Sequence, residues 1–206
     1  MSVWALVPAR SFADGKSRLG PALDATARRE LARRLFHHVM QQLAGVVDGV
    51  LVCTDSDEVA EAAARHGARV HRDPPEAKGL AAVVDGGLRS LAADGALVLM
   101  ADLPLLTGED VRQLVARMAE HPVVLVRAQD GRHTNALGLS PPTAFPTAFG
   151  GAESFAAHLV AAREAGLRAC VVDNPRVAFD VDEPRDLDQI RASSTTGISR
   201  PLAFFS

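Results

Sequence analysis

Residues 96–104 carry the sequence ALVLMADLP. Six apolar residues in a row, 96–101, are typical of a strand buried on both faces at the centre of a parallel sheet. Asp102 ends this run abruptly, and Pro104 favours an extended chain as it leaves the sheet. Ligands of such sheets bind outside the carboxyl ends of the strands, so we expect this carboxylate to face a ligand crevice.

Apolar runs of strand length alternate with amphipathic, helical patterns on both sides of this segment. Strands are expected at residues 3–7, 50–54, 68–71, 96–101, 123–126, 134–139, 170–173 and 177–179. Helices are expected at residues 25–43, 58–66, 80–92 and 153–165, after Thr107 and after Pro184. Asp24 stands at an N-cap position, Thr107 and Asp110 form a variant of the capping box, and Gly67 and Gly166 end two of the helices. The alternation predicts an α/β fold, with a single three-layer domain and a mostly parallel sheet over residues 1–191, followed by a C-terminal tail at 192–206.

Composition narrows the classes of function. The 206 residues include 22 basic and 25 acidic side chains, and a net charge of −3 gives no reason to expect binding to nucleic acid or to an anionic membrane. The N-terminus, MSVWALVPAR, does not resemble a signal peptide, and no apolar run reaches the ~18 residues of a membrane span, so a cytoplasmic location is expected. Cys53 and Cys170 stand in separate apolar runs, which favours buried free thiols over a disulfide or a zinc site. A small-molecule ligand fits these properties best.

A basic loop follows the first expected strand. Its sequence, ARSFADGKSRLG, brings together Arg10, Lys16 and Arg18 at the place where this architecture binds phosphates. Three cations there suggest a triphosphate, although the loop matches neither the P-loop nor the GxGxxG pattern. Solvated surface charge is the alternative explanation for these side chains.

Three aspartates are candidates for a metal site. Mg²⁺ takes one or two protein carboxylates together with substrate phosphates, so Asp102 is sufficient as an anchor. Asp180 and Asp182 close the last expected strand two residues apart, where an extended chain projects both side chains to the same side. Two alternatives stay open, because Asp102 can be a turn or capping residue and Asp182 can cap the helix after Pro184.

The sequence FGGAES, residues 149–154, leads directly into an expected helix. Free N–H groups at a helix start and the helix dipole together form a site for a small anion. Hydroxyl and amide groups in the same part of the chain add neutral donors. The candidates are Thr134, Asn135, Gly150, Gly151 and Ser154. Turn formation and capping explain these residues when they are taken singly, and His158 is expected to be a satisfied or surface histidine, not a catalyst.

Five motifs, VPARSFADGKSRL, ADLPLL, GRHTNALGLSPP, FGGAESFAAH and FDVDEPRDL, follow one another along the chain. In this order they resemble the 2-phospho-L-lactate guanylyltransferase family, which acts in the biosynthesis of the deazaflavin coenzyme F420. The resemblance covers residues 3–190. TNALGLSPP followed by FGGAESF is its most specific part, because ADLPLL recurs in many nucleotidyltransferases and related sugar transferases.

The resemblance implies a Rossmann-like nucleotidyltransferase fold of the GT-A type, Mg²⁺, GTP and a phosphorylated acid: phosphoenolpyruvate, 2-phospholactate or 3-phosphoglycerate. The expected catalytic residues are Lys16, Arg18 and Asp102, and the expected metal ligands are Asp102, Asp180 and Asp182. Nucleotide contacts are expected from Pro8, Arg10, Lys16, Arg18 and Gly79. Thr134, Gly151 and Ser154 match positions that hold the acid. The implied reaction joins GMP to the phosphate of the acid and releases pyrophosphate.

Two positions depart from the family pattern. Arg10 stands where the family usually has Lys, and Ala81 replaces the Asn of a Gly-Leu-Asn element, so an amide that would help to read the nucleotide is missing. Two rival interpretations follow: a transferase of the same fold with another acceptor, such as a sugar phosphate or a molybdopterin-like cofactor, and a non-catalytic nucleotide-binding homologue. The sequence also leaves open which acid is used and whether the chain forms a homodimer.

Overall fold

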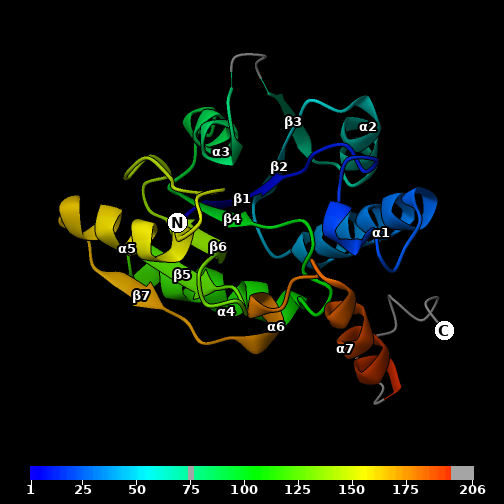
Figure 1. The fold of residues 1–206 in the computed structure, drawn as a ribbon. Coiled ribbons are helices and arrows are strands. Elements are labelled where there is room, and N and C mark those ends of the chain that lie inside the picture. Colours follow the sequence, from blue (N-terminus) through cyan, green and yellow to red (C-terminus); the bar gives the residue numbers. More distant parts are fainter. Residues whose placement is uncertain (74–76, 196–206) are drawn as a thin grey trace.

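A computed structural model describes residues 1–73 and 77–195, and this part of the chain forms a seven-stranded sheet with helices on both faces (Figure 1). The strands are β1 (Val3–Pro8), β2 (Gly49–Thr54), β3 (Arg69–Arg72), β4 (Gly95–Leu99), β5 (Val123–Arg127), β6 (Thr134–Leu139) and β7 (Ala169–Val171). The helices are η1 (Ser17–Leu19), α1 (Ala25–Leu43), α2 (Asp57–Arg65), α3 (Leu80–Arg89), α4 (Gly108–Glu120), α5 (Ser154–Glu164), α6 (Pro175–Ala178) and α7 (Pro184–Thr195).

The sheet is parallel apart from one strand. Its order is β3-β2-β1-β4-β6-β5-β7, and β6 runs antiparallel to both of its neighbours, β4 and β5. The predicted α/β class, with a single mostly parallel sheet in three layers, is therefore confirmed. The reversed direction of β6 is a feature that the hydrophobic pattern does not reveal, because both directions of a buried strand have the same pattern.

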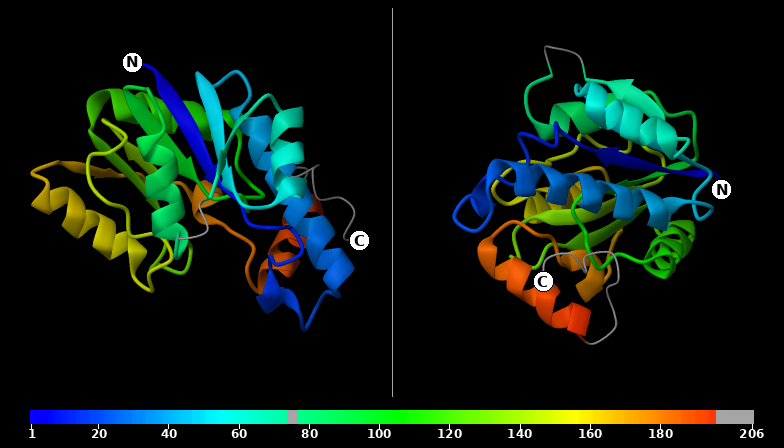
Figure 2. Two further views of the ribbon diagram at one scale, coloured as in Figure 1. Left: turned by 90° about the horizontal axis from the view of Figure 1, so that it is seen from above. Right: turned by 90° about the vertical axis from the view of Figure 1, so that its right-hand side faces the viewer.

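Side chains of each strand alternate between two hydrophobic clusters, one on each face of the sheet. Val3, Ala5 and Val7 of β1 pack with residues of α1, α2 and α4, whereas Leu6 packs on the opposite face with residues of α3 and α5. A third cluster joins α1 to α7, so the last helix lies beside α1 (Figure 2). The chain thereby returns to the end of the sheet where β1 and β4 terminate.

Several helix boundaries follow the predicted signals. Asp24 caps α1 by accepting a hydrogen bond from the N–H of Ala27 at 2.8 Å, and Thr107 and Asp110 form a reciprocal capping box at the start of α4. α2 and α5 each end near a glycine, and both of these glycines have a φ of 71°. That left-handed conformation is costly for other residues and suits a helix terminus.

One expected strand is wrong. Residues 177–179 are not extended as a strand, because Asn174 accepts hydrogen bonds from the N–H groups of Arg176 and Val177 and Pro175 occupies the first turn of α6. The short apolar run resembled a strand, but the cap and the proline are helix-start signals and they decide the local structure.

Smaller differences concern the element ends. The helix expected at residues 80–92 ends at Arg89, and β7 begins one residue earlier than predicted. The expected domain boundary at 191 falls within α7, and residues 196–206 of the predicted tail lie outside the described residues. Cys53 is buried, Cys170 is partly buried, and both thiols are free. Among the described helices, none is long and apolar enough to cross a membrane.

Candidate active site

The ends of four parallel strands, β1 to β4, meet at one edge of the sheet, and the start of β6 lies at the same edge. β6 is antiparallel, so its first residues pair with the end of β4: the N–H of Met100 donates to the carbonyl oxygen of Asn135 at 3.1 Å. This reversal brings Thr134 and Asn135 next to the chain that carries Asp102. The polar residues of two distant motifs therefore share one edge.

Two cavities open along this edge. The first, of about 870 Å³, is lined by the ends of β1 and β4, the basic loop and the start of α3. The second, of about 550 Å³, is lined by the start of β6, the turn before α5 and the segment between α6 and α7. The residues that line both are Leu80, Met100, Asp102 and Asp182. The cavities therefore adjoin at two of the three predicted metal ligands.

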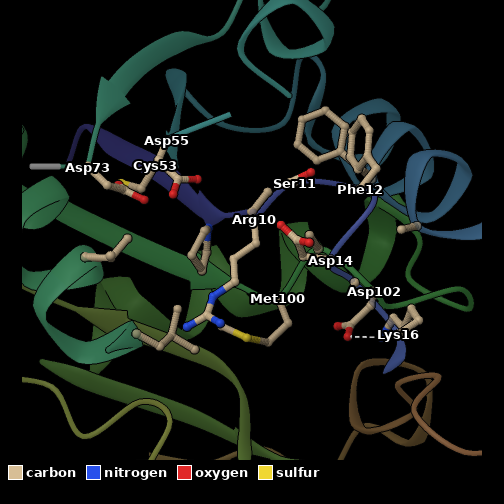
Figure 3. A pocket seen from close by; sticks show the side chains of 18 of the residues that line it. Arg10, Ser11, Phe12, Asp14, Lys16, Cys53, Asp55, Asp73, Met100 and Asp102 are labelled. Atoms are coloured by element: carbon tan, nitrogen blue, oxygen red, sulfur yellow. Dashed lines mark hydrogen bonds and ion pairs between the residues drawn. The ribbon is translucent and has the colours of Figure 1, made fainter. Parts of the chain in front are cut away.

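Charged groups lie at both ends of the first cavity (Figure 3). Lys16 and Asp102 lie at one end, Asp55 and Asp73 lie at the other, and the Arg10 side chain extends between them. Pro8 and Gly79 also line this cavity, as expected for nucleotide contacts, whereas Ala81 is not part of either lining. The end of this cavity that carries Asp55 and Asp73 is therefore separate from the end that carries Lys16 and Asp102 (Figure 3).

Lys16 is the central cation of the site. Its Nζ lies 2.5 Å from Asp102 Oδ2 and 3.0 Å from Asp182 Oδ1, and only 9% of its side chain is exposed. Burial by itself would lower the pKa of Lys16, but the negative charges of Asp102 and Asp182 outweigh it and raise the pKa. Its backbone has a φ of 60°, a strained conformation for a residue with a side chain. The loop therefore holds a permanent positive charge between the two carboxylates.

Asp102, Asp180 and Asp182 form a compact acidic cluster, with one oxygen of each within 4.8 Å of the others. Burial and the charge of Asp102 raise the pKa of Asp180 to about 6. Oδ1 of Asp102 is buried and has no hydrogen-bond partner among the described residues. Three carboxylates beside one buried ammonium, with an oxygen left unpaired, fit a divalent cation, because such ions take oxygen ligands.

The polypeptide around this cluster is held in place by two amide side chains. Asn135 Nδ2 lies within hydrogen-bond distance of the carbonyl oxygens of Val177 and Ala178, at 3.1 and 2.9 Å, and of Asp180 Oδ1, at 3.3 Å. Gln129 Nε2 donates to the carbonyl oxygen of Asp180 at 3.1 Å. Asn135 lines the second cavity, but its N–H donors point into the protein and orient a carboxylate of the cluster.

Asp182 does not occupy the position before α7, because the helix begins at Pro184 and Glu183 precedes it. The N–H groups of Asp182 and Glu183 both donate to Asp186 Oδ2, at 2.9 and 2.7 Å. Asp186 thus stabilises this helix start, and the carboxylate of Asp182 faces Lys16. The capping alternative considered for Asp182 is not the arrangement that is observed.

The second cavity contains neutral donors. Gly150, Ser154 and Thr134 line it, whereas Gly151 lies outside both linings and donates its N–H to the carbonyl oxygen of Ala148. The N–H of Phe155, in the first turn of α5, is also engaged, by the carbonyl oxygen of Arg132. Among the neutral donors at this end of the cavity, hydroxyl groups are therefore more prominent than free helix amides.

The cations of the basic loop are divided between the cavities. Arg10 and Lys16 line the first, and Arg18 lines the second, with 70% of its side chain exposed and NH1 at 3.7 Å from Asp182 Oδ2. From the sequence, all three side chains were expected to bind one triphosphate. The short helix η1 separates them because it begins directly after Lys16 and turns Arg18 toward the other side of the acidic cluster.

Some lining residues were not among the sequence candidates. Asp55 and Asp73 follow β2 and β3 as Asp102 follows β4, so the same strand-end rule identifies them. Arg132 and His133 of the second cavity lie in the turn between β5 and β6, and His133 Nδ1 contacts Asp130 Oδ2. Their position depends on the reversed direction of β6, for which the sequence carries no local signal.

The chain is similar to known proteins over most of its length. Residues 3–197 match the family described as "Guanylyl transferase CofC like". The chain is 40% identical over 198 residues to a phosphoenolpyruvate guanylyltransferase of Rubrobacter xylanophilus, covering 94% of this chain and 95% of the relative. It is 31% identical over 192 residues to a 2-phospho-L-lactate guanylyltransferase of Methanothermobacter thermautotrophicus, covering 92% and 84%.

A solved structure supports the fold. A protein of Desulfovibrio desulfuricans G20, described as a nucleotide-diphospho-sugar transferase, superposes with a TM-score of 0.81 at 19% identity, covering 98% of this chain and 94% of that one. This similarity concerns the fold alone. The family match and the two relatives, each spanning most of the chain, go further, and they show that this protein belongs to the CofC-like guanylyltransferase family.

Proposed function

We propose that the protein transfers GMP from GTP to the phosphate of phosphoenolpyruvate and releases pyrophosphate. The observation that carries this proposal is that two cavities of different chemistry adjoin at Asp102 and Asp182, where Lys16 is buried. GTP binds in the larger cavity and the acid in the smaller one. Membership of the family supports the reaction, and the relative at 40% identity supports phosphoenolpyruvate as the acid.

In this mechanism a phosphate oxygen of the acid attacks the α-phosphorus of GTP. A new P–O bond forms, the bond from the α-phosphorus to the bridging oxygen breaks, and pyrophosphate leaves with that electron pair. The attacking phosphate is already ionised near neutral pH, so no general base is required. Catalysis rests on positioning the two substrates in line and on offsetting their negative charge.

Each cation has a separate role in the proposal. Arg10 and Lys16 contact the triphosphate in the first cavity, and Arg18, at the mouth of the second, contacts the phosphate of the acid. Asp102, Asp180 and Asp182 would hold Mg²⁺, which when bound would offset phosphate charge and orient the reacting groups. The ammonium of Lys16 already contacts two of these carboxylates, so it lies close to the place proposed for the reacting phosphate.

The end of the first cavity that carries Asp55 and Asp73 is proposed to read guanine (Figure 3). Guanine presents two adjacent donor groups on one edge, N1–H and N2–H₂, and a carboxylate accepts from both. Asp73 suits this role because its Oδ1 is buried without a partner among the described residues. Asp73→Asn is expected to reduce the preference for GTP over ATP by on the order of tenfold or more in kcat/KM. An unchanged preference would exclude Asp73 from base recognition.

The test of the proposed function is pyrophosphate release by the purified protein with Mg²⁺. GTP, ATP and CTP are each combined with phosphoenolpyruvate, 2-phospholactate and 3-phosphoglycerate. Release that requires GTP and phosphoenolpyruvate together supports the proposal, and release with another acid changes the substrate but not the reaction. GTP binding without release for any acid would favour a binding protein or a different acceptor. A cytoplasmic setting and a place in coenzyme F420 biosynthesis belong to the same proposal.

A further inference from the structure

His158 lies on α5 directly behind the second cavity and is fully buried. The backbone N–H of Ala148 donates to its Nε2 at 2.9 Å, and its Nδ1 lies 3.0 Å from Thr134 Oγ1. The ring also packs edge-on against Phe149, with centroids 4.7 Å apart. The mechanism above does not use this histidine, although it touches one of the residues that line the acid cavity.

The contacts determine where the imidazole carries its proton. A backbone N–H can only donate, so Nε2 must be the unprotonated nitrogen. Burial lowers the pKa of His158 to about 4, and the ring is therefore neutral near pH 7. A neutral imidazole has one N–H, which here must be on Nδ1. It follows that His158 donates its hydrogen bond to the oxygen of Thr134.

This donation controls what the Thr134 hydroxyl can offer to a ligand. Because the oxygen accepts from His158, its own hydrogen has to point elsewhere, and the described residues provide no acceptor for it. Ser154 is in the same situation, since its Oγ accepts from the N–H of Thr134 at 3.2 Å. Both side chains line the second cavity and are almost completely buried. The free hydrogen of each hydroxyl is therefore available to an acceptor that binds in this cavity.

We infer that His158 is a positioning residue that makes the Thr134 hydroxyl a hydrogen-bond donor, beside the hydroxyl of Ser154, for an anionic group of the acid. The inference rests on the proposed function for the identity of that ligand. A hydroxyl that is free to rotate can accept as well as donate, and it gains less from an anion because its orientation has to be ordered on binding. His158 makes that orientation part of the fold.

Two substitutions separate positioning from packing. In His158→Gln the side-chain oxygen occupies the place of Nε2, so the bond from Ala148 is kept and the donor to Thr134 is lost. In His158→Asn the amide nitrogen occupies the place of Nδ1, so the donor is kept and the bond from Ala148 is lost. The Gln variant is expected to raise the KM for phosphoenolpyruvate about tenfold, the factor that corresponds to about 1.4 kcal/mol. The Asn variant should stay within about threefold, which is of the order of half that free energy.

The KM for GTP serves as the internal control and should not change in either variant. In a Thr134→Val background, which removes the hydroxyl, replacing His158 by Gln should have no further effect on the KM for the acid. Equal losses in the Gln and Asn variants, or losses that follow the melting temperature, would overturn the positioning role. So would a parallel rise in the KM for GTP.

A second measurement does not depend on turnover. The ring ¹⁵N chemical shifts of His158 in the substrate-free protein should identify Nδ1 as the protonated nitrogen, and protonation of Nε2 would overturn the inference. Calorimetric binding of phosphoenolpyruvate should show the same contrast between the Gln and Asn variants. If wild-type protein binds the acid with that contrast but releases no pyrophosphate, the proposed reaction fails and the positioning role stands.

Discussion

Asp110 and Asp180 are both aspartates withdrawn from solvent, yet their surroundings shift their pKa values in opposite directions. Burial alone would raise the pKa of Asp110, but hydrogen bonds from Arg176, Asn174 and Thr107 outweigh burial and hold the pKa at about 2. Asp180 receives one hydrogen bond, from Asn135, while burial and the neighbouring Asp102 raise its pKa to about 6. Hydrogen bonds within the protein fully offset the cost of burying the charge of Asp110, whereas those to Asp180 do not.

This difference distinguishes a structural carboxylate from one that is proposed to be functional. Asp110 joins the start of α4 to α6 through Arg176, whose NH2 lies 2.5 Å from Oδ1, and its side chain has no exposed surface. The acidic cluster of Asp102, Asp180 and Asp182 has Lys16 as its buried cation and keeps an unpaired oxygen. A buried charge that lacks sufficient partners is costly unless a ligand supplies them. A cation bound at this cluster would therefore supply the partners that its carboxylates lack, whereas Asp110 already has such partners.

Asp102→Asn tests the functional side of the comparison and has the largest expected effect. The change removes one charge from the cluster at the boundary of the two cavities, so kcat should fall by on the order of 100- to 1,000-fold. Stability should fall only moderately, because the buried ammonium of Lys16 loses one carboxylate partner but keeps Asp182. Relief of the repulsion between Asp102 and Asp180 offsets part of that loss. Steady-state pyrophosphate release and thermal melting measure the two quantities. Wild-type turnover in the variant would remove Asp102 from the catalytic site.

Asp110→Asn tests the structural carboxylate and should give the opposite result, a loss of stability with unchanged KM values. Removing this charge breaks the pair with Arg176 and weakens the capping box, so the free energy of unfolding should fall by about 3 kcal/mol. Urea denaturation measures this loss. The KM values for GTP and the acid should match those of the wild type, because Asp110 lines neither cavity. A stable variant with impaired KM values would contradict the assignment of Asp110 as structural.

The pH dependence of stability follows from the same carboxylate. The pKa of Asp110 falls from 3.8, its ordinary value, to about 2 in the folded protein. Its contribution is therefore fully present above pH ~4 and is lost as the pH falls toward ~2, amounting to about 2 kcal/mol. Denaturation of wild type and Asp110→Asn at several pH values isolates this contribution from other titrating groups. The difference between the two proteins should shrink between pH ~4 and ~2, and a constant difference would exclude the linkage.

The sequence predicted one of these two environments better than the other. The pairing of Thr107 with Asp110 is local and was recognised, whereas the contact with Arg176 spans 66 residues and depends on α6, which was expected to be a strand. Asp102 was predicted from its place after a buried parallel strand. Asp180 and Asp182 were expected to close a strand at 177–179, where the structure has α6, so the prediction for these two rested on the resemblance to the family. The left-handed backbone of Lys16, which carries its ammonium between the carboxylates, has no recognisable sequence signal.

The second cavity shows the same limit of prediction from the sequence. Thr134, Ser154 and His158 were noted individually. Of the two alternatives given for His158, a satisfied or a surface histidine, its two hydrogen bonds and its burial support the first. Their connection was not predicted, because it requires β6 to run antiparallel and so to bring Thr134 against α5. Strand direction depends on the long-range pairing of the whole sheet, and local periodicity contains no information about it.

Stabilisation by a bound metal ion is the smallest expected effect, and it gives the sharpest contrast between Asp102 and Asp110. A cation that binds the folded state alone stabilises it by RT ln(1 + [L]/Kd), which is about 1.4 kcal/mol at ten times Kd. For a chain of this size the melting temperature should rise by roughly 3–6 °C when Mg²⁺ is added to protein treated with EDTA. Asp102→Asn should lose most of this rise, and Asp110→Asn should keep it at a lower absolute melting temperature. If Mg²⁺ stabilised both variants equally, the cation would bind outside the acidic cluster, and the unpaired oxygen of Asp102 would need another explanation.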